Sequence, residues 1–239
     1  MIVLGADTSG RTLSVALARG NQLLGEYSLA MGYRHSVTFQ PLVNQLLDRC
    51  DLTLRDVELF ALAAGPGSFT GIRIGLASVQ AMAYAVGAKA MGVSSLRALA
   101  RSAGGDKRML TAPILDARGG RVFSSLYRGP EQLIEEAPRD IRSLFRDISA
   151  VAGPNEEVLV TGDGIAVWEE ALADDPDLAI RLPFDAVHAL PPFRYIRASA
   201  VIGLALEDLA RGKAATDPWQ LSACYGIASS AERARRIPD

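Results

Sequence analysis

Alternating apolar and polar positions at the start of the chain predict a three-stranded antiparallel meander. The first strand spans residues 2–6, and apolar alternation predicts two more strands, one around residues 13–17 and one over residues 23–29. The dipeptides Ser9-Gly10 and Gly20-Asn21 supply the two turns. Apolar residues then recur at helical spacing, which predicts a helix from about Ser36 to Cys50, just after His35. Its apolar stripe consists of Phe39, Leu42, Val43, Leu46, Leu47 and Cys50.

A glycine-rich segment, residues 65–71, separates a predicted strand that ends at Ala64 from a second, more apolar helix. The glycines allow backbone conformations that side chains forbid, and the proline fixes one angle, so the loop has a defined path. The helix spans residues 72–86, with Gly87 as its stop signal, and Ser68 or Thr70 can cap its first turn. The segment reads Gly65, Pro66, Gly67, Ser68, Phe69, Thr70 and Gly71.

Three readings of this loop stay open. Free N–H groups at a helix start bind anions readily, but the loop could equally face a partner protein or connect strand to helix without a ligand. It lacks the Lys-Ser/Thr ending of a P-loop, because Ile72 and Arg73 follow Gly71. Its glycine spacing is one residue too long for a dinucleotide fingerprint, and Pro66 stands where a nucleophile elbow needs glycine.

The first pattern returns in the second half of the chain at an offset of 109 residues, with Asp7 placed over Asp116. Strands over residues 110–115 and 122–127, a helix over residues 141–148 and a strand over residues 158–160 repeat the order of the first half. This offset also matches Gly10 with Gly119, Leu17 with Leu126, Arg19 with Arg128 and Gly20 with Gly129.

Two β-β-β-α-β-α halves predict an α/β chain of the actin-like ATPase fold, shared by acetate and sugar kinases, Hsp70 and actin. We expect one half over residues 1–105 and the other over residues 106–239, with a helix near residues 193–212 completing the second core. In that fold Asp7, Thr8 and Asp116 would flank nucleotide phosphates in a cleft. The alternative is that both aspartates only make side-chain turns to their own backbone.

Composition narrows the function classes. The chain has 239 residues, of which 49% are hydrophobic, so it can bury a large core. Its 25 basic and 27 acidic residues give a net charge of −2, which argues against direct RNA binding by this chain alone. We expect a cytoplasmic protein without a membrane segment. Cys50 and Cys224 form no C-x-x-C pair, which indicates packed or idle thiols.

On this architecture the glycine loop resembles that of the TsaB family, non-catalytic subunits of tRNA threonylcarbamoyladenosine biosynthesis that are also described as glycoprotease-like or peptidase M22-like. The most specific match is the run of residues 65–75, and the matches together cover residues 1–128. Supporting matches are residues 6–9, 34–36, 41–43, 92–96 and 116–118. The tail departs from the family pattern, since it reads Asp217-Pro218-Trp219 and ends in a charged segment, residues 232–236.

The resemblance implies a partner-binding role. Proteins like TsaB form homodimers through the two helices and hold the catalytic relative TsaD with much the same face. This makes the glycine loop with Arg73, and the helix with His35, Phe39, Leu42, Val43 and Leu46, the expected interface. Arg73 is there a salt-bridge or anion contact, or else a solvated side chain. Burial of both helices inside one core is the alternative.

The same comparison argues against the TsaD reaction in this chain. TsaD carries an H-x-x-x-H metal site after a Gly/Pro-Val step, whereas here the stretch after Val93 contains no histidine. With only His35 and His188 in the chain, peptidase chemistry also lacks its residues. We therefore expect no catalytic residue, no metal and no required cofactor, with weak nucleotide binding left open.

Two functions remain. The first is a non-catalytic scaffold that pairs with a TsaD-type subunit and a TsaE-type ATPase for modification of adenosine 37 in tRNA, contacting tRNA only through the complex. The second is an ATP-dependent phosphotransferase of the same fold. Ala117 stands where the first half has Thr8, which argues against the phosphotransferase.

Overall fold

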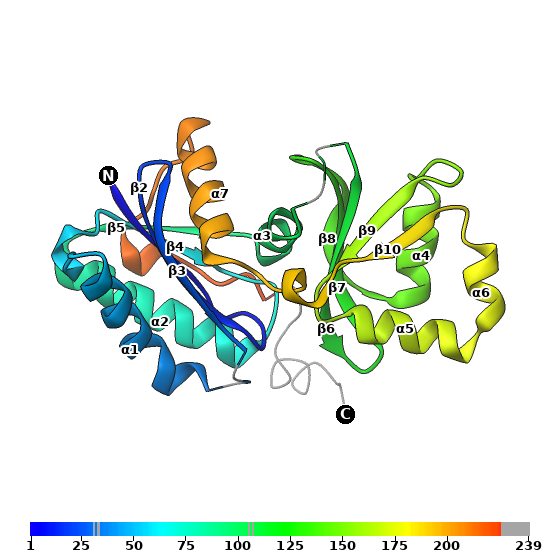
Figure 1. Ribbon diagram of the computed structural model, residues 1–239, viewed down its shortest axis with the longest axis horizontal. Coiled ribbons are helices and arrows are strands. Elements are labelled where there is room, and N and C mark those ends of the chain that lie inside the picture. Colours follow the sequence, from blue (N-terminus) through cyan, green and yellow to red (C-terminus); the bar gives the residue numbers. More distant parts are fainter. Residues whose placement is uncertain (31, 33, 105, 107, 226–239) are drawn as a thin grey trace, which may run out of the picture. The chain divides into compact units, whose positions relative to one another are not determined.

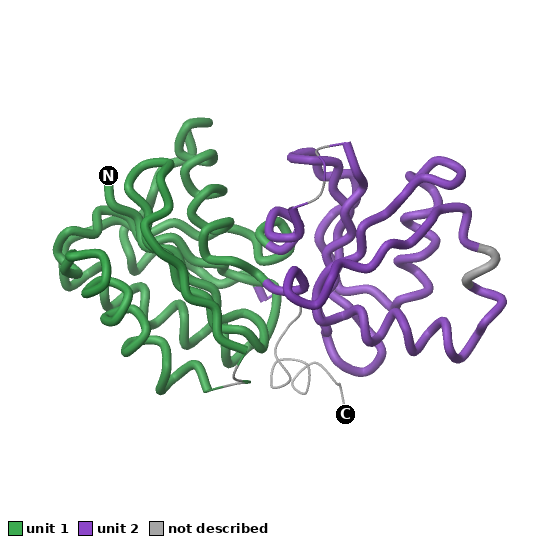
Figure 2. Tube along the Cα trace, in the orientation of Figure 1, with its two compact units in different colours: residues 1–98, 196–224 green, residues 99–195, 225–239 purple. Residues whose placement is uncertain are grey.

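The computed structural model describes residues 1–30, 32, 34–104, 106 and 108–225, and it forms two compact units (Figure 2). Unit 1 comprises residues 1–98 and 196–224, and unit 2 comprises residues 99–195 with Tyr225. The expected boundary at residue 105 therefore differs from the observed division, because residues 196–224 return to unit 1. The charged end of the chain, residues 232–236, lies outside the described residues.

Unit 1 is built on a five-stranded sheet of order β3-β2-β1-β4-β5. The first three strands form the meander that the sequence predicts, and β4 and β5 continue the sheet in parallel with β1. Every residue of β1 and β4 is buried, as expected for central strands covered on both faces. The strands are β1 (Ile2–Asp7), β2 (Leu13–Arg19), β3 (Gln22–Leu29), β4 (Leu59–Ala63) and β5 (Lys89–Val93).

Three helices cover this sheet (Figure 1). On one face lie α1 (His35–Arg49) and α2 (Phe69–Val86), where Leu42, Val43 and Leu46 pack into the same core as Val79 and Met82. On the other face lies α7 (Ala198–Ala210), which contacts all five strands. It approaches closely at Gly5, where a Cβ atom would lie 2.6 Å from the carbonyl oxygen of Ala198. Short 3-10 turns, η1 (Leu54–Asp56) and η3 (Pro218–Gln220), complete the unit.

The position of α7 corrects the expectation that a helix near residues 193–212 completes the second core. Its apolar residues, among them Val201, Ile202 and Ala205, are buried against the first sheet instead. The reason is that the first sheet has one face left uncovered by α1 and α2. An apolar helix pattern shows that a helix needs a sheet, but it does not show which one.

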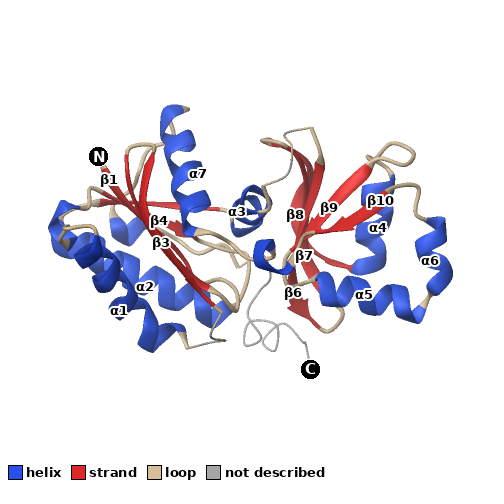
Figure 3. Ribbon diagram, in the orientation of Figure 1, coloured by secondary structure: helices blue, strands red, loops and turns tan. Residues whose placement is uncertain are grey.

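Unit 2 repeats the topology, with sheet order β8-β7-β6-β9-β10. Its antiparallel meander and two parallel strands follow the same chain order as those of unit 1 (Figure 3). The duplicated, actin-like α/β fold is therefore confirmed, and each half carries one more strand than the predicted unit. The strands are β6 (Leu110–Arg118), β7 (Arg121–Arg128), β8 (Glu131–Asp140), β9 (Glu157–Thr161) and β10 (Asp185–His188).

The core of unit 2 centres on Trp168, which is fully buried. Its ring meets Phe145 edge-on at 4.4 Å between centroids and Phe184 at 6.4 Å. The helices of unit 2 are α4 (Ile141–Ser149), α5 (Ile165–Asp174) and α6 (Pro176–Arg181), with a 3-10 turn, η2 (Pro191–Phe193). Helix α3 (Ser95–Ser102) begins in unit 1 and ends in unit 2. Among the described residues no helix combines the length and apolar character that a membrane crossing requires.

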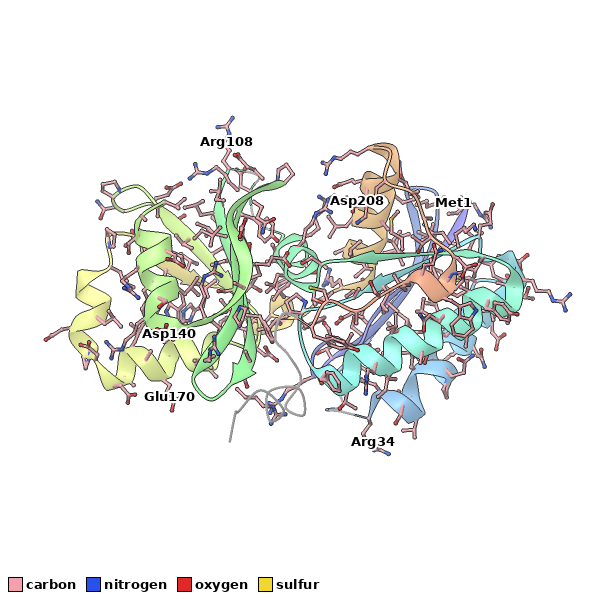
Figure 4. The ribbon with its side chains drawn as sticks, turned by 180° about the vertical axis from the view of Figure 1, so that it is seen from behind. Met1, Arg34, Arg108, Asp140, Glu170 and Asp208 are labelled. Carbon is pink, nitrogen blue, oxygen red and sulfur yellow. The ribbon has the colours of Figure 1, made fainter. Side chains whose placement is uncertain are left out.

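A buried carboxylate anchors α7 in unit 1 (Figure 4). Asp208 is 7% exposed, and its two oxygens accept hydrogen bonds from Arg97 Nη1 at 2.7 Å and from Lys213 Nζ at 3.2 Å. Burial raises the pKa of Asp208, but the hydrogen bonds and charges of Arg97 and Lys213 together outweigh burial. The pKa of Asp208 therefore lies below its ordinary value of 3.8.

Asp208→Asn is expected to lower the free energy of unfolding by about 1–2 kcal/mol near neutral pH, because Arg97 loses its charged acceptor. Since the folded-state pKa is depressed, the carboxylate stabilises the fold above about pH 4, and this contribution is lost as the pH falls through the folded-state pKa. Urea denaturation at pH 7 and at pH 3 should show a difference between the two proteins that shrinks in acid. An equal difference at both pH values would contradict this assignment.

Candidate functional site

The glycine loop, residues 65–71, leads from the end of β4 into α2, as the sequence predicts. Ser68 is the N-cap of α2, and its Oγ accepts a hydrogen bond from the N–H of Gly71 at 3.3 Å. The helix ends at Gly87, which adopts the left-handed conformation. The predicted strand, loop and helix are therefore confirmed, except that the helix begins at Phe69, three residues earlier than expected.

The loop packs directly against the segment that follows β1. The N–H of Ser68 donates to the carbonyl of Ser9 at 2.7 Å, and Thr8 Oγ1 donates to the carbonyl of Gly71 at 2.8 Å. A Cβ atom on Gly71 would overlap the carbonyl oxygen of Thr8, so only glycine permits this approach. Thr8 and Ser9 are 0% and 2% exposed, and their polar groups are engaged within the protein.

Asp7 holds its own loop in shape. Its Oδ1 accepts hydrogen bonds from the N–H of Ser9 at 3.0 Å and from Ser9 Oγ at 2.6 Å, and the residue is 1% exposed. Asp116 makes the same local turn in unit 2, where its Oδ1 accepts from the N–H of Arg118 at 2.7 Å. The side-chain turn considered from the sequence therefore occurs at both aspartates. Asp116 itself is exposed, and its N–H donates to Asp163 Oδ1 at 2.9 Å, a partner that the sequence pattern did not suggest.

On its other side the glycine loop is bonded to the start of α3. The N–H of Gly65 donates to Ser95 Oγ at 3.1 Å, and the N–H of Ser95 donates to the carbonyl of Gly65 at 2.8 Å. The peptide bond between Gly65 and Pro66 is cis. Of the N–H groups that the sequence offered as an anion site, those of Gly65, Ser68 and Gly71 thus donate inside the protein.

The apolar stripe of α1 lies inside unit 1. Phe39, Leu42, Val43 and Leu46 are at most 6% exposed and belong to the core beneath the sheet. His35 is 2% exposed, and its Nε2 lies 2.8 Å from the carbonyl oxygen of Gly10, which ties α1 to the loop after β1. The expectation that these five side chains touch a partner is corrected, because the core of their own unit covers them. Only the opposite face of α1 is exposed.

The exposed face of α2 consists of small side chains flanked by aromatic residues. Near its start, the guanidinium of Arg73 lies over the ring of Phe69, 4.5 Å from the centroid. Arg73 thus makes a cation–π contact within its own helix. Near its end, the ring of Tyr84 lies 5.5 Å from that of Trp219, and these two side chains are 65% and 58% exposed. Between them the exposed positions are Ala77 and Ala81.

Sequence reasoning overlooked this aromatic pair. Tyr84 lies on the helical row that runs from Arg73 through Ala77 and Ala81, so spacing could have identified it. No local signal places Trp219 beside it, since the two residues are far apart in the chain. Among the described residues, no three histidine, cysteine, aspartate or glutamate side chains are grouped as metal ligands.

Comparison with known proteins shows the family to which this chain belongs. The model of the family described as TsaD, tRNA N6-adenosine threonylcarbamoyltransferase, matches residues 30–193. The tRNA threonylcarbamoyladenosine biosynthesis protein TsaB of Bacillus subtilis is 33% identical over 175 residues, which cover 73% of this chain and 76% of that protein. The chain belongs to the TsaB family. The TsaB protein of Escherichia coli is 30% identical over 192 residues, covering 76% of this chain and 79% of that protein.

A solved structure described as YeaZ from Pseudomonas aeruginosa shares the fold of this member of the TsaB family. Its TM-score is 0.72 at 26% sequence identity, and the alignment covers 94% of this chain and 99% of that one. A second structure, described as an uncharacterized protein with similarity to peptidase YEAZ from Pseudomonas aeruginosa, has a TM-score of 0.74 at 26% identity. The likeness covers 95% of this chain, so it extends over both units.

Gly71→Ala is expected to lower the free energy of unfolding by about 1–3 kcal/mol, because the new methyl group overlaps the Thr8 carbonyl that packs on the glycine loop. The matched control is Gly10→Ala, where a Cβ atom would meet nothing within 4 Å. Chemical denaturation of the two variants should separate them clearly. Equal stability of both variants would show that the glycine loop does not contact the Asp7–Ser9 segment closely.

Proposed function

We propose that this protein is a non-catalytic subunit in the biosynthesis of threonylcarbamoyladenosine at position 37 of tRNA, where it binds and supports a TsaD-type catalytic subunit. The TsaB relatives, named for this pathway, support the biological process. The observation that carries the binding role is the exposed face of α2. Its single charged residue is Arg73, and small side chains occupy its centre.

Such a face suits a partner helix. The small side chains of Ala77 and Ala81 allow another helix to approach to the usual 8–10 Å between axes, and no acidic side chain on α2 has to lose its water. The exposed side of α1 carries uncharged residues at Val37, Gln40 and Asn44, and its charged residues, Asp48 and Arg49, lie at the end of the helix. We infer that these two faces, with Phe69 and Arg73 at the end of the glycine loop, hold the TsaD-type subunit. In its absence they pair two copies of this chain.

Several residues that could react are engaged in structural contacts, which supports the proposed absence of catalysis. Thr8 and Ser9, which pack against the loop, are buried, and their hydroxyls are bonded to Gly71 and Asp7. His35 holds the loop after β1, and His188 of unit 2 lies 3.4 Å from Glu169. These contacts disfavour the phosphotransferase considered from the sequence. We propose that the protein requires no nucleotide, and that a TsaE-type subunit supplies the ATPase of the complex.

The decisive experiment is reconstitution with purified components. A TsaD-type subunit, a TsaE-type ATPase, ATP, threonylcarbamoyl-adenylate and substrate tRNA are combined with and without this protein, and the modified nucleoside is measured. We expect modification to depend on the protein and to be absent when the protein is the only subunit present. Modification that is equal with and without it would exclude the scaffold role, and turnover of nucleotide by the isolated chain would favour the phosphotransferase.

Ala81→Arg is expected to weaken binding of the TsaD-type subunit at least about tenfold, because a long charged side chain then stands where the partner helix must approach. The control is Ala173→Arg, which places the same side chain at an exposed position on α5 of unit 2. Calorimetric titration measures both affinities, and thermal unfolding checks that both variants fold. Unchanged affinity for Ala81→Arg would remove this face of α2 from the interface.

A further inference from the structure

Residues 216–224 form a strap that runs from the edge of the first sheet to the glycine loop. At its start, Thr216 and Ala90 of β5 exchange two backbone hydrogen bonds, of 2.9 and 3.0 Å. In its middle, the carbonyl of Leu221 accepts from Gln80 Nε2 of α2 at 3.1 Å. The side chain of Leu221 is 8% exposed and belongs to the core of unit 1. The strap is therefore attached to both β5 and α2 before it reaches the glycine loop.

The strap ends at the first residue of the glycine loop. The N–H of Cys224 donates to the carbonyl of Ala64 at 2.7 Å. Gly65 has a φ of +112°, and a Cβ atom there would overlap the carbonyl oxygen of Cys224. Together with the two bonds to Ser95, this contact confines Gly65 from two directions.

The confined segment leads directly to exposed residues. Gly65 is four residues from Phe69 and eight from Arg73, which form the exposed start of α2. Each further backbone bond removes conformational freedom from a loop that contains three glycines, the residues that gain most from being unfolded. A loop already fixed before binding loses less entropy when a partner covers it.

We propose that the strap is a positioning element whose contact at Cys224 fixes the glycine loop, and with it the start of α2, in the conformation that binds the catalytic partner. This inference rests on the proposed function. The strap would cover the core of unit 1 even without the contact at Cys224, so this contact has a separate role. Leu221 alone would fill the space beside Gly92, whereas the backbone bond from Cys224 reaches Ala64, which joins β4 to Gly65.

The test compares two substitutions in the full-length protein. Cys224→Pro removes the N–H that donates to Ala64, whereas Cys224→Ala keeps this N–H and removes only the thiol. We expect Cys224→Pro to speed hydrogen exchange of residues 65–71 by about three- to tenfold, as for loss of one net hydrogen bond, and to weaken binding of the TsaD-type subunit similarly. Cys224→Ala should match the wild type, and exchange in β1 and β4 should stay unchanged in both variants.

Two truncations give an independent comparison. A chain that ends at Gln220 loses Leu221 and Cys224, whereas one that ends at Tyr225 keeps the whole strap. The shorter chain should show fast exchange in residues 65–71 and weak partner binding, and the longer one should behave as the full-length protein. Unchanged exchange in both Cys224→Pro and the shorter chain would overturn the strap's role. Absence of binding by the wild type would instead overturn the proposed function, and with it the partner part of this inference.

Discussion

The contact between the glycine loop and the Asp7–Ser9 segment is the constraint on which the rest of unit 1 depends. The backbones approach so closely at Gly71 that a single methyl group would separate them. This approach brings the Ser68 N–H to the Ser9 carbonyl and the Thr8 hydroxyl to the Gly71 carbonyl, so buried polar groups find partners. The start of α2 is thereby fixed relative to β1, and the exposed face of α2 follows from it. The position of this exposed face therefore depends on a buried contact.

The contact of the glycine loop lies at the carboxyl ends of the strands of unit 1. In open α/β sheets, ligands bind at the carboxyl ends of the strands. Unit 1 fills that edge with its own groups, because the segments after β1, β4 and β5 bond to one another through Ser9, Gly65 and Ser95. Unit 2 repeats the topology and the turn at Asp116, but there the residue is exposed and its hairpin closes tightly at Gly119 and Gly120. The strand ends of unit 2 are also bonded to one another, since the N–H of Gly164 donates to the carbonyl of Ile114 at 3.1 Å.

Much of the fold could be predicted from the sequence because it depends on local pattern. The meander, both helices of the first half, the glycine loop and the duplication all have short-range signals in period, turn residues and caps. Two errors have a common cause. Phe39 and Leu46 were expected at an interface and α7 in the second core, since an apolar face shows that a side chain needs cover but not what covers it. The contacts of Cys224 with Ala64 and of Trp219 with Tyr84 join distant segments, and no local pattern encodes them.

A closed strand edge has a consequence for how such a protein binds. Opening the loop would break the bond from the Ser68 N–H to the Ser9 carbonyl, and the net loss of such a bond costs about 0.5–1.5 kcal/mol. Several such bonds act together at Asp7, Thr8 and Gly65, so the loop resists rearrangement when its surroundings change. A surface supported in this way presents one shape to a partner, and little of the binding free energy is spent on ordering it. Rigidity at the glycine loop is therefore compatible with the proposed scaffold role.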